Sequence, residues 1–320
     1  MLSLAICLAA YGLVAAVFAP VALARWTGSG SAPRFELAAW LVAMLTVLGS
    51  WAAAAALLVA QTATLSGGSA QVVNACVATV SAAAVGAHGA MIQLGLLTLA
   101  VLVVVTLLIG AARVAQNLLR GRRLTHEHAL TARLIGQPMP DGTTVLLDTT
   151  QQLVYCVPGR PGTIVVTRPA RDLLTDAQLR AVLAHERAHL RGRHHTWVAL
   201  TRALALLLPR MTLFTAGARA VGRLTELCAD DAAVRSCDRR HVFDALLRLG
   251  TSAPVGPGIL AATGGSVTAR LARLLEPPSR AQRLHHQLTL AVVLTALILA
   301  PIAVTVLATG GLAGCGSTLT

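Results

Sequence analysis

The segment from residue 37 to residue 112 contains no Asp, Glu, Lys or Arg. A helix needs about 20 residues to cross the hydrocarbon layer of a membrane, so this uncharged segment can hold two crossings. The polar, small-residue run 61–71 should interrupt the helical pattern between them. We expect these two spans, with one more on each side, at residues 2–24, 37–60, 90–112 and 288–310.

The composition agrees with a membrane protein. Hydrophobic residues make up 55% of the chain and the mean hydropathy is +0.69, more than a soluble protein of this length needs. The formal net charge is +13, but only two Tyr and four Phe are available to stack on bases. We therefore expect the bilayer and its anionic headgroups as partner, and no direct contact with nucleic acid. The six cysteines form no CxxC pair and are interpreted as buried thiols.

The arginines predict the orientation in the cell membrane, because arginine-bearing short loops stay in the cytoplasm. Arg25 and Arg34 place the first loop inside, and the arginine-free segment 61–89 lies outside. A cluster of arginines that begins at Arg113 then places the central region inside. The prediction is a multi-pass α-helical membrane protein with three parts: a three-span domain at 1–112, a cytoplasmic domain at 113–286, and a final span with a short tail at 287–320.

An alternative for the first span is a signal peptide, since Ala22-Leu23-Ala24 fits a small-residue cleavage site. The absence of a basic segment before the apolar run, and the arginines that follow it, oppose this alternative. A further apolar stretch at 196–211 contains Arg202, whose charge would be costly at mid-membrane. We expect this stretch to form an interfacial helix and not a span.

The central region has an α+β pattern. Three short β-rich runs at 143–148, 152–157 and 162–167 are separated by turn residues and predict a small antiparallel sheet. A helix should follow, because Thr175 as N-cap and Gln178 three residues later form a capping box.

This helix carries the sequence H-E-x-x-H. His185 and His189 are four residues apart and project from one face, so both imidazoles can hold one zinc ion. Glu186 lies beside them, where its carboxylate can take a proton from the water that attacks a peptide carbonyl. The motif is the signature of zinc peptidases.

Two residues compete to be the third zinc ligand. Gly192 and His195 extend the motif to H-E-x-x-H-x-x-G-x-x-H, the pattern of metzincin peptidases. Glu226 lies in the apolar sequence RLTELCADDAAV, where a lone carboxylate would need a partner, and Asp230 follows it by four residues on the same helical face.

The run IVVTRPARDLLTDAQLRAVLAHERAH, followed by E-x-x-x-D and a final span, resembles the integral-membrane gluzincins over most of the chain. These are the HtpX and CAAX prenyl protease family and, still more closely, the BlaR/MecR type of antibiotic-sensor peptidase. The resemblance implies that His185, His189 and Glu226 hold one Zn²⁺ and that Asp230 supports a ligand histidine. We favour Glu226 over His195, and expect His194 and His195 to be polar residues at the helix end.

The predicted function is a membrane zinc metalloendopeptidase that cleaves protein or peptide substrates at the cytoplasmic face. A substrate could lie extended beside the strand at 162–167. Three alternatives stay open: a signalling protease linked to a transcriptional repressor, a quality-control protease for membrane proteins, and a non-catalytic membrane scaffold.

Overall fold

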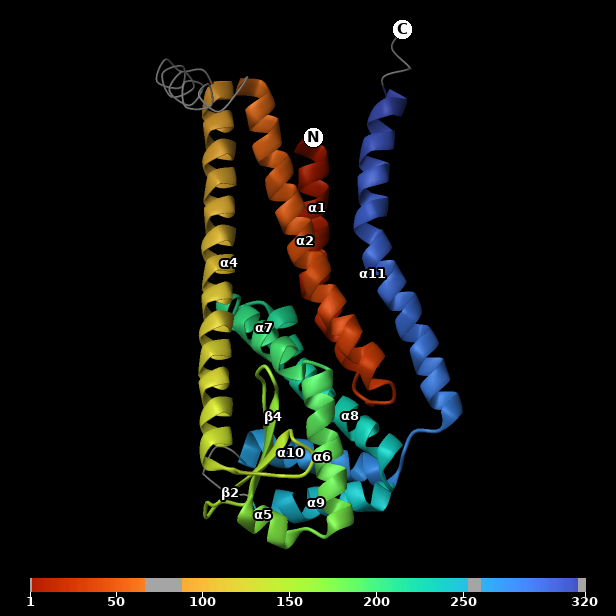
Figure 1. The fold of residues 1–320 in the computed structure, drawn as a ribbon. Helices are drawn as coiled ribbons and strands as arrows, with labels where there is room; N and C mark the ends of the chain where they lie inside the picture. The colour runs from red at the N-terminus through yellow and green to blue at the C-terminus, as the bar shows by residue number, and fades with distance from the viewer. Residues whose placement is uncertain (1, 67–87, 253–259, 316–320) are drawn as a thin grey trace.

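Four long helices run side by side away from a smaller domain in the computed structural model, which describes residues 2–66, 88–252 and 260–315 (Figure 1). They are α1 (Leu2–Trp26), α2 (Pro33–Ser66), α4 (His88–Ile135) and α11 (Arg280–Cys315). α2 contacts the other three, so it is the central helix of this bundle.

Three helices are long and apolar enough to cross a membrane, judged over the residues described: Leu4–Trp26, Pro33–Ala60 and Arg280–Val306. The fourth expected span, 90–112, forms much of the first half of α4, but several of its side chains lie outside the described residues, and it stays a prediction. The expected break at 61–71 is wrong at its start, because α2 continues to Ser66. No Gly or Pro lies between residues 61 and 66, and the next glycine comes at residue 67. The remainder of the expected break, 67–71, lies outside the described residues.

α2 is anchored on the smaller domain by a buried apolar core. Trp40 and Met44 of α2 pack with Phe214 of α8 (Thr212–Ser236). A Cβ atom at Gly217 would lie 1.9 Å from Cε of Met44, so glycine allows the close approach of the two helices. The indole of Trp40 also donates a hydrogen bond to Thr27 Oγ1 at 2.9 Å. The smaller domain is therefore packed directly on a candidate span.

The sheet has four strands: β1 (Gln137–Pro138), β2 (Thr144–Leu147), β3 (Val154–Val157) and β4 (Thr163–Thr167). Their order is β1-β2-β4-β3. The prediction of an antiparallel sheet is wrong in part, because β2 and β4 pair in parallel. β3 pairs with the far side of β4 and not with β2. β4 therefore lies between β2 and β3 and runs in the same direction as β2.

The strand expected to receive substrate, β4, is central. It pairs with β2 on one side and β3 on the other, and all five of its residues are buried. It has no free backbone edge to offer to a peptide. The free edge of the sheet on this side belongs to β3.

Helices cover the rest of the domain: α5 (Arg168–Leu173), α6 (Asp176–Arg191), α7 (His194–Leu207), α8, α9 (Arg239–Ser252) and α10 (Leu260–Leu275). The capping box is confirmed, since Thr175 and Gln178 exchange hydrogen bonds at the start of α6. Leu179 and Leu183 of α6 pack on the sheet against Ile164. α7 lies at the end of the domain nearest the long helices (Figure 1). The interfacial role of 196–211 and the domain boundaries at 112 and 286 remain predictions.

Candidate metal centre

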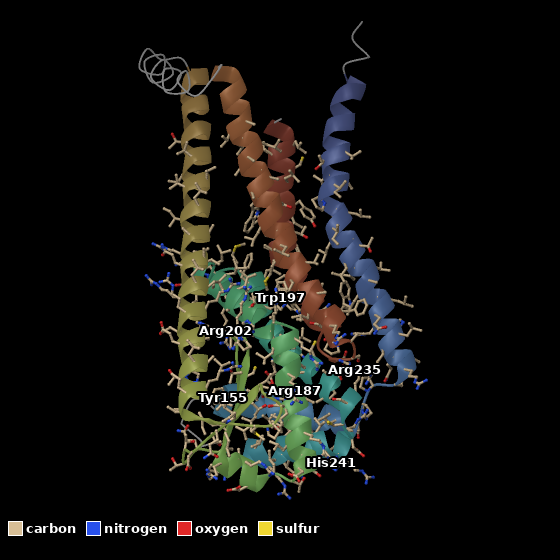
Figure 2. The ribbon with its side chains drawn as sticks, in the orientation of Figure 1. Tyr155, Arg187, Trp197, Arg202, Arg235 and His241 are labelled. Carbon is tan, nitrogen blue, oxygen red and sulfur yellow. The ribbon has the colours of Figure 1, made fainter. Side chains whose placement is uncertain are left out.

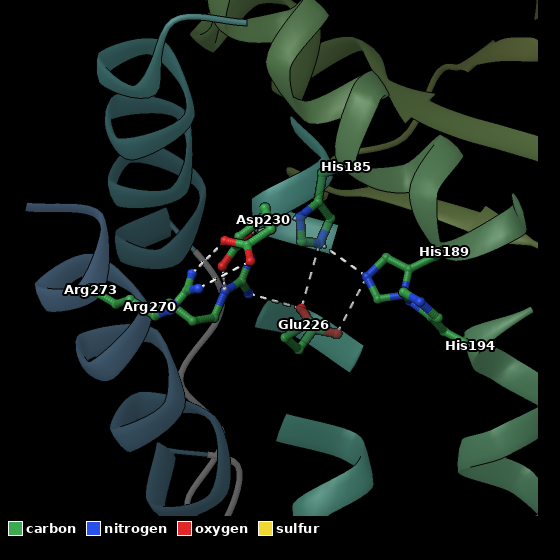
Figure 3. A network of polar contacts seen from close by, with 8 residues as sticks. His185, His189, His194, Glu226, Asp230, Arg270 and Arg273 are labelled. Atoms are coloured by element: carbon green, nitrogen blue, oxygen red, sulfur yellow. Dashed lines mark hydrogen bonds and ion pairs between the residues drawn. The ribbon is translucent and has the colours of Figure 1, made fainter. Parts of the chain in front are cut away.

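α6 positions two imidazoles toward one point. His185 and His189 lie one turn apart, and their Nε2 atoms are 3.0 Å from each other (Figure 3). Their side chains are only 12% and 14% exposed. Local helical geometry is enough to explain this pair, because residues four apart share a face.

α8 brings a carboxylate to the same point. Oε2 of Glu226 lies 3.5 Å from Nε2 of His185, and Oε1 lies 3.5 Å from Nε2 of His189. Ligand atoms about 2.1 Å from a tetrahedral zinc ion are about 3.4 Å apart, close to all three separations here. Two imidazole nitrogens and one carboxylate oxygen are also a ligand set of catalytic zinc. The three residues therefore fit a zinc ion, and they form the one potential metal-binding group found among the described residues.

Asp230 contacts the far side of one histidine. Its Oδ1 lies 3.0 Å from Nδ1 of His185, and its side chain is buried. This contact favours a proton on Nδ1 and leaves the lone pair of Nε2 free for a cation. The structure thus joins both acids of the E-x-x-x-D sequence to His185.

Arg270 of α10 is a component of the site that the sequence analysis did not identify. Its guanidinium donates to Oε2 of Glu226 at 2.9 Å and to both oxygens of Asp230, at 2.8 and 2.7 Å (Figure 3). All but 12% of the Arg270 side chain is buried. Arg270 is one of many arginines and lies 44 residues from Glu226 in the sequence. It belongs to no motif that could have indicated this role.

The sequence profile of Peptidase family M48 matches residues 118–278, half of the chain, and the match includes all of these residues. The chain belongs to peptidase family M48. Membership makes it a zinc metallopeptidase by family, with a protein substrate as the family name implies. No curated protein and no solved structure matches the chain.

The carboxylate of Glu186 in this M48 peptidase faces β3. Burial raises the pKa of Glu186, and the charge of His185 and hydrogen bonding by Cys156 of that strand counteract the rise only in part. A carboxylate with a raised pKa, held at the wall of the metal centre, is suited to accept a proton and pass it on.

The two candidate ligand histidines have opposite pKa shifts. Burial lowers the pKa of His185, but hydrogen bonds to Asp230 and Glu226 outweigh this effect and raise it to about 9. Burial and the charge of His185 lower the pKa of His189 to about 4. Burial raises the pKa of Glu226, but His185 and Arg270 outweigh burial and lower it to about 2. The carboxylate is therefore anionic at neutral pH, as a metal ligand must be.

Of the two histidines after α6, His194 differs from the expectation and His195 agrees with it. His194 is buried, and its Nδ1 lies 3.0 Å from Nδ1 of His189, whereas His195 is exposed and lies outside the metal-binding group. Arg193 adopts a left-handed backbone with φ of 49°, which turns the chain back over the end of α6. Gly192 leaves room for this fold, because a Cβ there would lie 2.4 Å from Nε2 of His194. A tight turn thus decides that His194 is buried and His195 exposed. The spacing of the histidines in the sequence could not reveal this.

A cavity of about 160 Å³ lies beside Glu186 and the metal centre. Its apolar wall includes Val182 of α6 and Leu246 and Leu249 of α9, and its polar wall includes Glu186 and Arg270. The cavity combines an apolar side with the chemically active groups.

Proposed function

We propose that this M48 peptidase is a membrane-embedded zinc metalloendopeptidase that hydrolyses peptide bonds of protein substrates at the cytoplasmic face. The observation that carries the proposal is the convergence of His185, His189 and Glu226 beside the carboxylate of Glu186. The candidate spans supply the membrane attachment. The arginine distribution supports the cytoplasmic side.

Each residue has a distinct role in this proposal. Zinc, when bound by the two histidines and Glu226, would polarise the substrate carbonyl and acidify water. Glu186 accepts the proton of the attacking water and passes it to the leaving amine nitrogen. Asp230 holds His185 in the tautomer that binds metal, and Arg270 holds the two acids in place.

The substrate backbone would lie along β3, and not along β4 as expected from the sequence. The N–H of Thr167 in β4 donates a hydrogen bond to the carbonyl of Leu153, just before β3. In an antiparallel pair every second residue makes such bonds to the neighbouring strand. The backbone groups of Val154 and Cys156 therefore face away from β4. A peptide added at this edge would run next to the base, with an apolar side chain in the 160 Å³ cavity.

A Glu186→Gln variant tests the proposal. It should retain stoichiometric zinc and lose at least about 100-fold in activity on a fluorogenic peptide library, because the base is removed and the ligands are kept. Glu127→Gln, an exposed acid of α4, is the matched control and should stay active. A wild-type protein without zinc, and with the same activity as the Glu186 variant, would support the scaffold alternative instead.

Sidedness needs a separate test. A variant with its six cysteines replaced by serine and a single Arg160→Cys, in the turn between β3 and β4, is treated with a membrane-impermeant maleimide. Labelling only after cell lysis is expected for a cytoplasmic domain. Labelling of intact cells would refute the cytoplasmic site.

A link to a transcriptional repressor would additionally require the repressor to be cleaved by the purified enzyme.

A further inference from the structure

A second and larger cavity lies on the other side of His194 from the zinc-binding residues. Its volume is about 560 Å³, and its walls come from the start of α2, the end of α6 and the second half of α8. Each of these helices contributes one arginine: Arg34, Arg191 and Arg235. Figure 2 shows Arg235 close to the lower end of α2.

The cavity is cationic. No Asp or Glu is among its lining residues, and none of the three guanidinium groups makes an ion pair within the part of the chain that the structure describes. Three like charges around one concave space repel one another and create a positive potential there. An anion that entered the cavity would relieve this repulsion.

The cavity also lies at the edge of the predicted membrane. Arg34 is the second residue of the candidate span Pro33–Ala60. Leu37, almost one turn further along the span, forms part of the wall. Arginines beside the apolar Leu37 at the start of a candidate span suit a phospholipid, whose phosphate lies next to its acyl chains.

We propose that this cavity binds a phosphate group, carried by an anionic phospholipid headgroup or present as free phosphate. The planar guanidinium presents its N–H donors in a fork that fits two phosphate oxygens, and three such forks approach from three helices. Basic pockets beside membrane helices are a recognised way to hold lipid headgroups. The proposal is independent of the peptidase reaction.

The position of the site connects it to the metal centre. His194 lines the cavity, and its Nδ1 lies 3.0 Å from Nδ1 of His189. A ligand in the cavity would therefore pack behind a candidate zinc ligand.

The test uses the full-length chain in a non-ionic detergent and three probes: dioctanoyl phosphatidylglycerol, dioctanoyl phosphatidylcholine and inorganic phosphate. Binding is measured by native mass spectrometry. The triple variant R34Q/R191Q/R235Q should weaken phosphatidylglycerol binding at least ten-fold. The control R160Q/R180Q/R240Q removes the same charge from exposed positions outside the cavity and should change it less than two-fold. Each single cavity variant should weaken binding two- to five-fold, which guards against a folding defect in the triple.

The probes distinguish the source of the phosphate. A membrane lipid is supported as the source of the phosphate if phosphatidylglycerol binds more tightly than inorganic phosphate. It must also bind more tightly than phosphatidylcholine, which has a cationic choline. Inorganic phosphate that binds as tightly as the lipid, with the same loss in the triple variant, supports a soluble source. Equal lipid binding by the two triple variants would overturn the proposal. So would the absence of binding by phosphatidylglycerol and by inorganic phosphate alike.

Discussion

Two nitrogens of the Arg270 guanidinium donate hydrogen bonds to the two carboxylate oxygens of Asp230, at 2.8 and 2.7 Å. Asp230 in turn contacts His185, so an arginine of α10 fixes the orientation of a candidate zinc ligand on α6. The metal centre therefore depends on three helices, although its motifs lie on two.

An Arg270→Lys variant should bind zinc about 10- to 100-fold more weakly, because an ammonium cannot reproduce the two-pronged contact with Asp230. Zinc affinity is measured by competition with a chelator. Arg273→Lys is the matched control: it lies three residues further on α10 and makes the same type of contact with Asp231, which is not near the histidines. Equal affinities for the two variants would refute the positioning role.

The identity of the third ligand can be decided by metal analysis. Glu226→Gln should lose most of the zinc, since it removes a ligand and leaves His185 and His189 alone. His195→Ala should keep full zinc occupancy, because His195 is exposed and outside the group. Loss of zinc in the histidine variant alone would support the metzincin arrangement and contradict ours.

Binding of substrate along β3 can be tested with proline. Val154→Pro removes an N–H that faces away from β4, so the ladder between the strands survives while one donor to the substrate is lost. We expect KM to rise about five-fold, the effect of about 1 kcal/mol from one hydrogen bond, with kcat little changed. Val154→Ala retains the N–H and should keep the original KM. An unchanged KM in the proline variant would refute the β3 assignment.

The salt bridge between Asp141 and Arg187 predicts a pH-dependent stability. Burial raises the pKa of Asp141, but hydrogen bonds from Thr144, Arg187 and Thr143 outweigh burial and hold the pKa well below its usual value. Because the folded pKa is the lower one, the stabilisation is complete above about pH 4 and is lost as the pH falls further. Asp141→Asn should lower the free energy of unfolding by about 1 kcal/mol at pH 7, with no difference from wild type at strongly acidic pH.

The control for this prediction is Asp148→Asn. Asp148 pairs with Arg168 at 3.5 Å and is 80% exposed, so its substitution should have little effect at any pH. Chemical denaturation of both variants from pH 7 down to strongly acidic pH provides the comparison. A stability difference for Asp141→Asn that is constant across this range would contradict the assignment to its charge.

The amino-acid sequence by itself determined the local features of this protein. An apolar run of about 20 residues, a capping box at Thr175 and a four-residue spacing between His185 and His189 act within one helix, where geometry follows directly from residue order. The β-rich runs indicated the strands for the same reason.

Only the tertiary structure decided which segments meet. The parallel pairing of β2 with β4, the free edge at β3 and the contact of Arg270 with Glu226 join residues whose separation along the chain carries no signal. The burial of His194 depends on a single left-handed residue, Arg193. Long-range contacts are selected by the packing of whole helices and by the pairing of charges in a buried space, and neither is encoded in any short stretch of sequence.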